Sequence, residues 1–435
     1  MKNFYNIAVK CRRVVEKSLD QCNANFFSRH LTSQKKPRKS RTKTDESCSS
    51  TDSISEAKDA ITAESRANPK ASILYLMDQE IAKTIAGLIV AHRSVKTPHV
   101  MQMNPGLGVL TEELLKAGIQ EIEMFEGTEY FWPRLMDLQL RFHKNLYLQK
   151  VNFGHIFEVA YRDWKNETND LDDYFNNVKE KAWRNLASYE IIGSVADRNF
   201  TYRLVQSLVL HSNLRQKGRM ILYLCVPPSV MLELICKNDH YDLYRTPIVL
   251  FQTLFQCKVL GELPRSAFYP QYSKSKKQRK HCREELYKKD RESMFLIKIE
   301  GNRHLFNRKF TEKDLLVYYY FVKHHFKARV TRVIPALESW VPGCGPALIK
   351  DGFNIFTQFG ELLPHEVLKL YLKFKSLPGF KKSAFLSSNP VLSNVNTFFS
   401  DMEQYDNWNE NTVDFDNIFQ TSVKEFEDGK KELIR

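Results

Sequence analysis

Short apolar runs typical of buried strands alternate with amphipathic stretches typical of helices from residue 99 onward, and this alternation constrains the fold more than any other feature. The crossover between successive strands is long enough to carry a helix, which is the spacing of βαβ units with parallel strands. We therefore predict an α/β fold with a doubly wound, mostly parallel sheet. The strands are expected at residues 99–103, 121–125, 146–151, 190–193, 220–226, 256–260 and 294–299, with helices at 72–90, 109–116 and 202–214.

Composition divides the chain into further regions. Residues 31–70 are rich in Ser, Thr and charged residues and poor in large apolar residues, as disordered linkers are. From residue 311 onward the pattern is helical only, and residues 401–435 hold 10 acidic against 4 basic side chains. The predicted regions are a targeting peptide (1–30), a disordered linker (31–70), an α/β domain (71–303), a small helical C-terminal domain (304–400) and an acidic tail (401–435).

The first residues have the pattern of a basic amphipathic helix. Apolar and basic side chains fall on opposite faces of a helical wheel, with Phe4, Ile7, Ala8, Cys11 and Val15 on one face and Lys2, Lys10, Arg13 and Lys17 on the other. This pattern is typical of a mitochondrial transit peptide and predicts import into the mitochondrial matrix. A surface helix, or a nuclear signal in the basic run at 35–43, are the alternatives.

The charge of the chain favours a polyanionic partner. Lys and Arg number 65 against 51 Asp and Glu, which gives a formal net charge of +14. A basic surface attracts phosphate backbones because binding releases their counterions. Nucleic acid is therefore the first class of partner to consider.

Cysteine spacing and hydropathy argue against three other classes. The eight cysteines show no C-x-x-C spacing and none lies near paired histidines, so we expect neither a structural metal site nor a disulfide framework. The longest apolar run, at 220–236, contains two prolines and a glutamate and is too short to cross a bilayer.

A glycine-bearing segment follows the strand expected at 99–103. Its sequence is Asn104-Pro105-Gly106-Leu107-Gly108, and a helix is predicted directly after it. Such a loop lets a ligand approach the backbone at a helix N-terminus, although many strand-to-helix turns contain glycine for steric reasons alone. Glu126 ends the next strand, where a carboxylate could accept hydrogen bonds from ribose hydroxyls or could simply be solvated.

In this order the segments resemble the ribosomal RNA adenine dimethyltransferases, and most closely their mitochondrial transcription factor B relatives. The resemblance covers roughly residues 72–380. Beyond the glycine loop, it rests on residues 263–270 (LPRSAFYP), which are similar to the family's proline-rich loop at the target-base pocket. Residues 295–298, 305–307 and 323–326 resemble the transcription-initiation branch in particular. The resemblance implies a Rossmann-like methyltransferase sheet with a small C-terminal helical domain.

Several positions depart from what the family implies for its cofactor, S-adenosylmethionine. Gln102 stands where active members carry an acidic residue, Asn104 replaces the first glycine, and Asn152 replaces the acid that meets the adenine. The family's Gln-Asn-Phe-Leu segment reads Ile73-Leu74-Tyr75-Leu76 here. The cofactor contacts implied by the resemblance are thus Leu76, Gln102, Asn104, Gly106, Gly108, Glu126 and Asn152. These departures weaken the site, and S-adenosylmethionine remains a possible cofactor that the leading function does not require.

The catalytic motif departs further from the family. Active members carry Asn-Leu-Pro-Tyr, which holds the adenine amino group and stacks on the base, and the matching residues here are 194–197 (SVAD). Ser194 is too short to replace the amide and Asp197 cannot stack, so we predict no catalytic residues and no methyl transfer.

Two basic clusters are candidates for nucleic-acid contact. The first follows Tyr269 on a loop and includes Lys274, Lys276, Lys277, Arg279 and Lys280; the second, at the end of an aromatic-rich helix, includes His324, Lys327, Arg329 and Arg332. Basic side chains beside aromatic ones suit a phosphate track with base stacking. A solvated insertion and an ordinary cation-stabilised helix end are the corresponding alternatives.

Together these patterns predict a mitochondrial transcription initiation factor that binds mitochondrial RNA polymerase and stabilises melted promoter DNA. An S-adenosylmethionine-dependent mitochondrial small-subunit rRNA adenine dimethyltransferase is the alternative. A third reading is a non-catalytic factor of ribosome assembly that binds the small-subunit rRNA. No membrane partner and no metal are expected.

Overall fold

The computed structural model describes residues 55–62, 73–93, 99–142 and 145–387, apart from short gaps and one longer segment. The gaps lie at 155, 157–158, 161, 164–167, 169, 197–199, 211 and 240–243, and the longer segment is 271–288. The predicted targeting peptide and acidic tail therefore lie outside the described residues. The same holds for Asp197 and for the first basic cluster, at 274–280.

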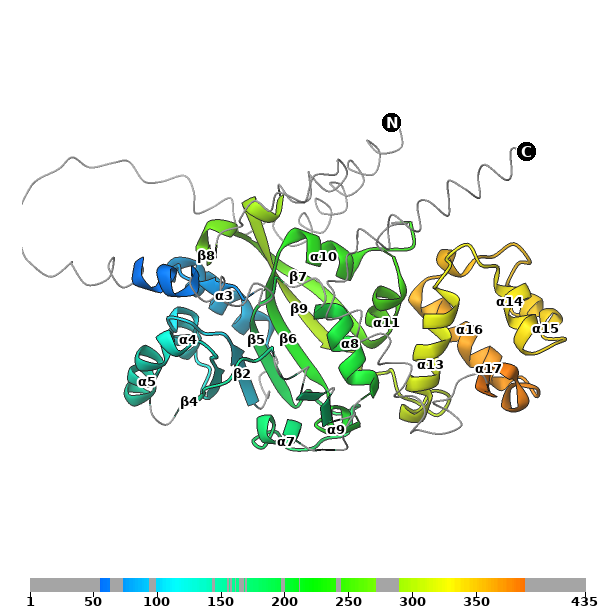
Figure 1. The fold of residues 1–435 in the computed structure, drawn as a ribbon, viewed down its shortest axis with the longest axis horizontal. Helices are drawn as coiled ribbons and strands as arrows, with labels where there is room; N and C mark the ends of the chain where they lie inside the picture. Colours follow the sequence, from blue (N-terminus) through cyan, green and yellow to red (C-terminus); the bar gives the residue numbers. More distant parts are fainter. Residues whose placement is uncertain are drawn as a thin grey trace, which may run out of the picture. The chain divides into compact units, whose positions relative to one another are not determined.

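A mixed seven-stranded sheet forms the centre of the larger unit, in the order β4-β3-β2-β5-β6-β9-β7 (Figure 1). The strands are β2 (His99–Met103), β3 (Ile122–Phe125), β4 (Leu146–Gln149), β5 (Tyr189–Ser194), β6 (Met220–Val226), β7 (Phe255–Pro264) and β9 (Ser293–Gly301). Neighbours from β4 to β6 are parallel, whereas β9 is antiparallel to both β6 and β7. This order is that of the Rossmann-like methyltransferase fold, so the predicted fold class is confirmed.

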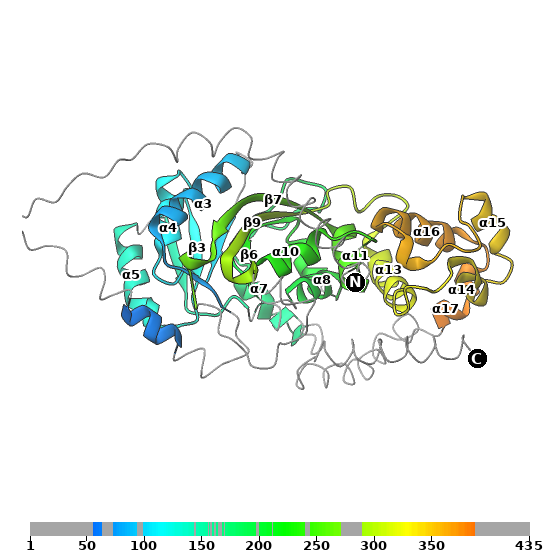
Figure 2. The same ribbon diagram turned by 90° about the horizontal axis from the view of Figure 1, so that it is seen from above.

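The helices on the sheet form two groups. Helix α3 (Gln79–His92) packs against α4 (Val109–Lys116), and α8 (Phe200–Leu210) packs against α11 (Thr246–Leu254). Figure 2 shows these two groups on opposite sides of the sheet. Every residue of β3, β5 and β6 is buried, as expected for central parallel strands that are covered on both faces.

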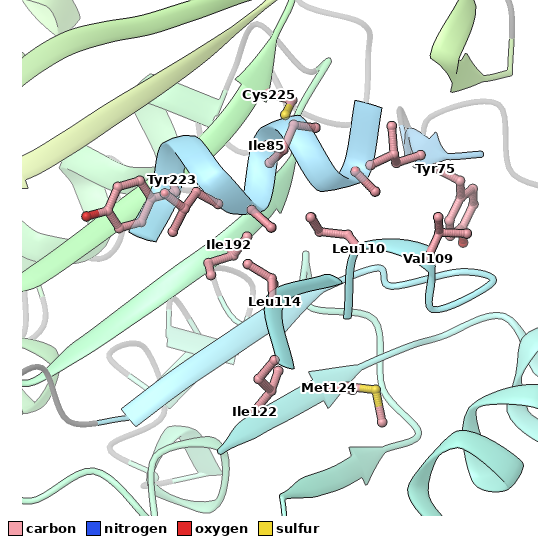
Figure 3. Packing of buried hydrophobic residues seen from close by; sticks show 14 of the residues in the cluster. Tyr75, Ile85, Val109, Leu110, Leu114, Ile122, Met124, Ile192, Tyr223 and Cys225 are labelled. Carbon is pink, nitrogen blue, oxygen red and sulfur yellow. The ribbon is translucent and has the colours of Figure 1, made fainter. Parts of the chain in front are cut away.

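Apolar side chains between α3, α4 and the sheet form the hydrophobic core nearest the glycine loop. Ile85 of α3 and Leu110 and Leu114 of α4 gather around Ile192 of β5 (Figure 3). Because these residues are spaced for one face of a helix, α4 buries Leu110 and Leu114 and turns Lys116 to solvent. This packing fixes the start of α4, and with it the loop that precedes it.

The structure differs from the predicted local structure in three places. Residues 73–76 belong to strand β1 (Tyr75–Leu76) and the residues before it, and α3 begins only at Gln79, so the helix predicted from residue 72 starts too early. Residues 55–62 form a helix whose Ala57 and Ile61 join the core, so the prediction of a disordered linker is wrong for these residues. The helices α10 (Pro228–Ile235) and α11 were not predicted.

The chain divides into two compact units. Among the described residues, 332–357 and 370–387 make up the second unit, whereas α13 (Glu312–His325) and residues 358–369 belong with the sheet. The sequence pattern places the boundary of the helical domain earlier, at residue 304. In the second unit, α14 (Val333–Trp340) and α15 (Gly345–Lys350) are joined by a turn, and Phe374, Phe380 and Phe385 pack together as aromatic rings.

Candidate cofactor pocket and nucleic-acid interface

The loop from Asn104 to Gly108 has the left-handed backbone that its sequence allows. The φ angles are 50° at Asn104, 58° at Gly106 and 74° at Gly108, which is the N-cap of α4. A Cβ atom at Gly106 would lie 2.7 Å from Cδ1 of Tyr75, and one at Gly108 would lie 2.9 Å from Cδ2 of Leu138. Both glycines are therefore required by close approach as well as by φ.

Glu126 follows β3 and is completely buried, with an exposed fraction of 0%. One carboxylate oxygen accepts a hydrogen bond from the Gly106 backbone N–H at 3.0 Å. The other accepts from the Thr128 backbone N–H at 2.9 Å and from the Tyr75 hydroxyl at 3.2 Å. The sequence predicted where this carboxylate lies, but not that the protein's own groups would surround it.

Burial changes the acidity of Glu126. It raises the pKa of the carboxyl group to about 7, although the hydrogen bonds from Thr128, Gly106 and Tyr75 favour the charged form. The folded state therefore binds this proton more tightly than the unfolded state does between about pH 4.5 and pH 7. The contribution of this group to stability is present below that window and is lost as the pH rises through it.

We expect Glu126→Gln to remove this pH dependence. The free energy of unfolding of the wild type should fall relative to that of the variant as the pH rises from about 4.5 to about 7. Urea denaturation of both proteins across this range measures the difference. A difference that stays constant with pH would show that Glu126 does not titrate there.

Tyr75 and Leu76 are brought to the pocket by strand β1. This strand pairs antiparallel with β8 (Phe268–Tyr269), with Tyr75 opposite Tyr269 and Leu76 opposite Phe268. Ile73 forms a bridge with Val195. The segment therefore joins the residues that resemble the proline-rich loop to the position of the catalytic motif.

The two amides that replace acidic residues are engaged within the protein. The Gln102 side chain is buried, and its oxygen accepts a hydrogen bond from the Thr111 hydroxyl at 2.8 Å. The Asn152 side-chain oxygen accepts from the Gly154 backbone N–H at 2.8 Å. Thr111 lies in α4, so Gln102 links β2 to that helix. Each amide oxygen thus accepts one hydrogen bond within the protein and keeps a second lone pair.

The catalytic position holds a small buried side chain. Ser194 ends β5 opposite Cys225 of β6, and its side chain is buried. Serine reaches less far than asparagine and lacks its amide group. Ser194 therefore cannot replace the amide that holds the adenine amino group in active members of the family that the chain resembles.

S-adenosylmethionine does not fit the pocket as its residues are arranged. The ribose would have to bond to Glu126, which has no exposed surface and already accepts a hydrogen bond from the Tyr75 hydroxyl. No step of a methyl transfer can therefore be derived from these residues. Within the described parts of the chain, no group of three or more His, Cys, Asp or Glu is placed to hold a metal ion.

The second basic cluster is divided by the structure. Lys327, His324 and Arg332 are exposed. Arg329 instead donates hydrogen bonds to the backbone oxygens of Asn238, at 3.0 Å, and Gly360, at 2.9 Å. We therefore correct the assignment of Arg329 as a nucleic-acid contact, because its guanidinium group links two segments of the protein instead.

Sequence reasoning missed the residues that close the pocket. Tyr75, Thr128 and Phe131 form a buried set, with the Tyr75 hydroxyl 2.7 Å from the Thr128 hydroxyl and the rings of Tyr75 and Phe131 4.9 Å apart between centroids. The helix at 55–62 was also missed, and its Thr62 hydroxyl lies 2.7 Å from that of Tyr269. The available signal was the tyrosine at position 75, where the family has phenylalanine.

No helix among the described residues combines the length and the apolar character that a membrane span requires.

The chain is similar to several known proteins. No family model matches it. A Drosophila melanogaster protein named "Dimethyladenosine transferase 2, mitochondrial" is 28% identical over 358 residues, covering 72% of this chain and 78% of the relative. The Homo sapiens protein of the same name is 24% identical over 310 residues, covering 70% of this chain and 76% of the relative.

Among solved structures, a dimethyladenosine transferase from Plasmodium falciparum aligns with a TM-score of 0.45 and 12% identity, over 69% of this chain and 97% of that one. The relatives from Drosophila melanogaster and Homo sapiens match the chain along most of its length and are named mitochondrial. This chain is accordingly a homologue of the proteins named mitochondrial dimethyladenosine transferase 2.

Proposed function

We propose that the protein is a mitochondrial transcription initiation factor that binds mitochondrial RNA polymerase and stabilises melted promoter DNA. The observation that carries this proposal is the pocket itself. Glu126, the group that would hold the ribose of a cofactor, is buried and paired with Tyr75, Thr128 and Gly106. A scaffold whose cofactor pocket is filled serves better for binding than for methyl transfer.

The nucleic-acid side of the proposal rests on charge. The chain carries a net charge of +14, and Lys327 and Arg332 are exposed. Exposed cations of this kind contact phosphates without reading sequence, which suits the holding of a melted strand. The resemblance to the transcription-initiation branch favours promoter DNA and the polymerase as partners, and the nucleoid of the matrix as the location.

The second candidate is an S-adenosylmethionine-dependent dimethyltransferase of the mitochondrial small-subunit rRNA. The names of the relatives favour it, as do the left-handed glycine loop and the acidic residue after β3. Against it stand the short side chain of Ser194, which lacks an amide group, and the burial of Glu126.

Run-off transcription tests the proposal. Purified mitochondrial RNA polymerase on a linear mitochondrial promoter should give abundant full-length transcript with this protein and little without it. An equal amount of heat-denatured protein is the control for added mass and buffer. Equal transcript in both reactions, over a range of protein concentrations, would reject the role in initiation.

A further inference from the structure

The Tyr75 side chain lies in the pocket, beside Gly106 and Glu126. Its ring lies against Gly106, where a Cβ atom would come within 2.7 Å of the ring, and it contacts the ring of Phe131. Its hydroxyl group lies 3.2 Å from a carboxylate oxygen of Glu126 and 2.7 Å from the Thr128 hydroxyl. A flat ring that ends in a hydroxyl donor thus lies between the glycine loop and the acidic residue.

The carboxylate of Glu126 has little capacity left for a ligand. A carboxylate offers about four lone-pair directions. Gly106, Thr128 and Tyr75 use three of them, and the Thr128 side chain also stabilises the charged form. Because the residue is fully buried, a ribose could bond to it only after one of these groups had moved.

Tyr75 differs from the other two donors because it reaches Glu126 through its side chain, from a strand outside the β2–β3 region. The backbone of this strand is fixed by pairing: Tyr75 pairs with Tyr269, and the Met77 N–H donates to the Ala267 oxygen at 2.9 Å. The strand therefore keeps the ring in the pocket. The two other donors, Gly106 and Thr128, are backbone groups of the loops that carry the site.

We propose that the Tyr75 hydroxyl is a built-in substitute for a ribose hydroxyl in this pocket, which keeps S-adenosylmethionine and other adenosine-containing ligands from bonding to Glu126. The hydroxyl uses the carboxylate lone pair that a ribose would use. Phenylalanine, the family's residue at this position, has no such group, and removing the hydroxyl frees Glu126 for an adenosine.

Binding of S-adenosylhomocysteine and S-adenosylmethionine to the full chain, measured by calorimetry, tests the proposal. Tyr75→Phe and Tyr75→Leu should bind roughly tenfold or more tightly than the wild type, because both lack the hydroxyl that occupies the Glu126 carboxylate. Tyr147→Ala, at an exposed tyrosine of β4, is the matched control.

The variants separate the outcomes even if one of them folds poorly. Tyr75→Phe retains the ring contact with Phe131, so it serves if Tyr75→Leu lowers the melting temperature strongly. Wild-type binding as tight as that of Tyr75→Phe would overturn the proposal, and so would a folded Tyr75→Leu that binds no better. The assay measures ligand binding alone, so its failure is distinct from a failure of the proposed role in transcription.

Discussion

Purified protein given labelled S-adenosylmethionine and a small-subunit rRNA hairpin is expected to transfer no methyl group above a protein-free reaction. Two independent features cause this. The short Ser194 side chain lacks the amide that would hold a base, and Glu126 is buried and paired with the Tyr75 hydroxyl. Loss of positioned polar groups typically costs about 10²–10³ in rate for each group, so losses at both places leave nothing measurable.

An active dimethyltransferase in a parallel reaction shows that the hairpin and the label are competent. Ser194→Asn alone should remain inactive, because the cofactor still cannot reach Glu126. The double variant Ser194→Asn with Tyr75→Leu addresses both defects, and any activity it gains should require both changes. Turnover by the wild type comparable to that of the active enzyme would contradict the prediction.

Neutralising the exposed cations of the second basic cluster is expected to weaken binding to single-stranded or bubble DNA. The suitable variant is Lys327→Gln with Arg332→Gln. It leaves Arg329 in place because that side chain bonds to Asn238 and Gly360. For every phosphate that the variant no longer neutralises, the salt slope of binding to a single strand should fall by about 0.7. Transcription from a linear promoter should decrease along with DNA binding.

A pre-melted promoter separates strand holding from other defects. If the cations hold the opened strand, a template with an existing bubble should restore much of the transcript, since the costly opening has been done beforehand. An unchanged melting temperature is the control, because the guanidinium group of Arg332 also lies over the Phe356 ring, 5.3 Å from its centroid. Wild-type transcription by the double variant at several salt concentrations would exclude this cluster and leave the basic segment at 274–291 as the candidate.

Local pattern was enough for several elements of the sheet and for the helix after the glycine loop. The bounds of β2, α4 and β6 agree with those predicted, because a short apolar run or a helical period carries the information by itself. Strand β1 was read as part of a helix. Its partner, β8, lies almost 200 residues away along the chain, between Tyr75 and Tyr269, and no local pattern reports such a pairing.

The sequence by itself determined the sheet, the left-handed loop at Asn104–Gly108 and the position of Glu126 after β3, because strand alternation and glycine spacing are local properties. Only the tertiary structure decided what that site can bind. The three donors to Glu126 come from Tyr75, Gly106 and Thr128, which lie on separate segments. Whether a carboxylate is open to a ligand or already satisfied depends on which side chains the fold brings to it, and burial of that kind is a property of packing rather than of any single segment.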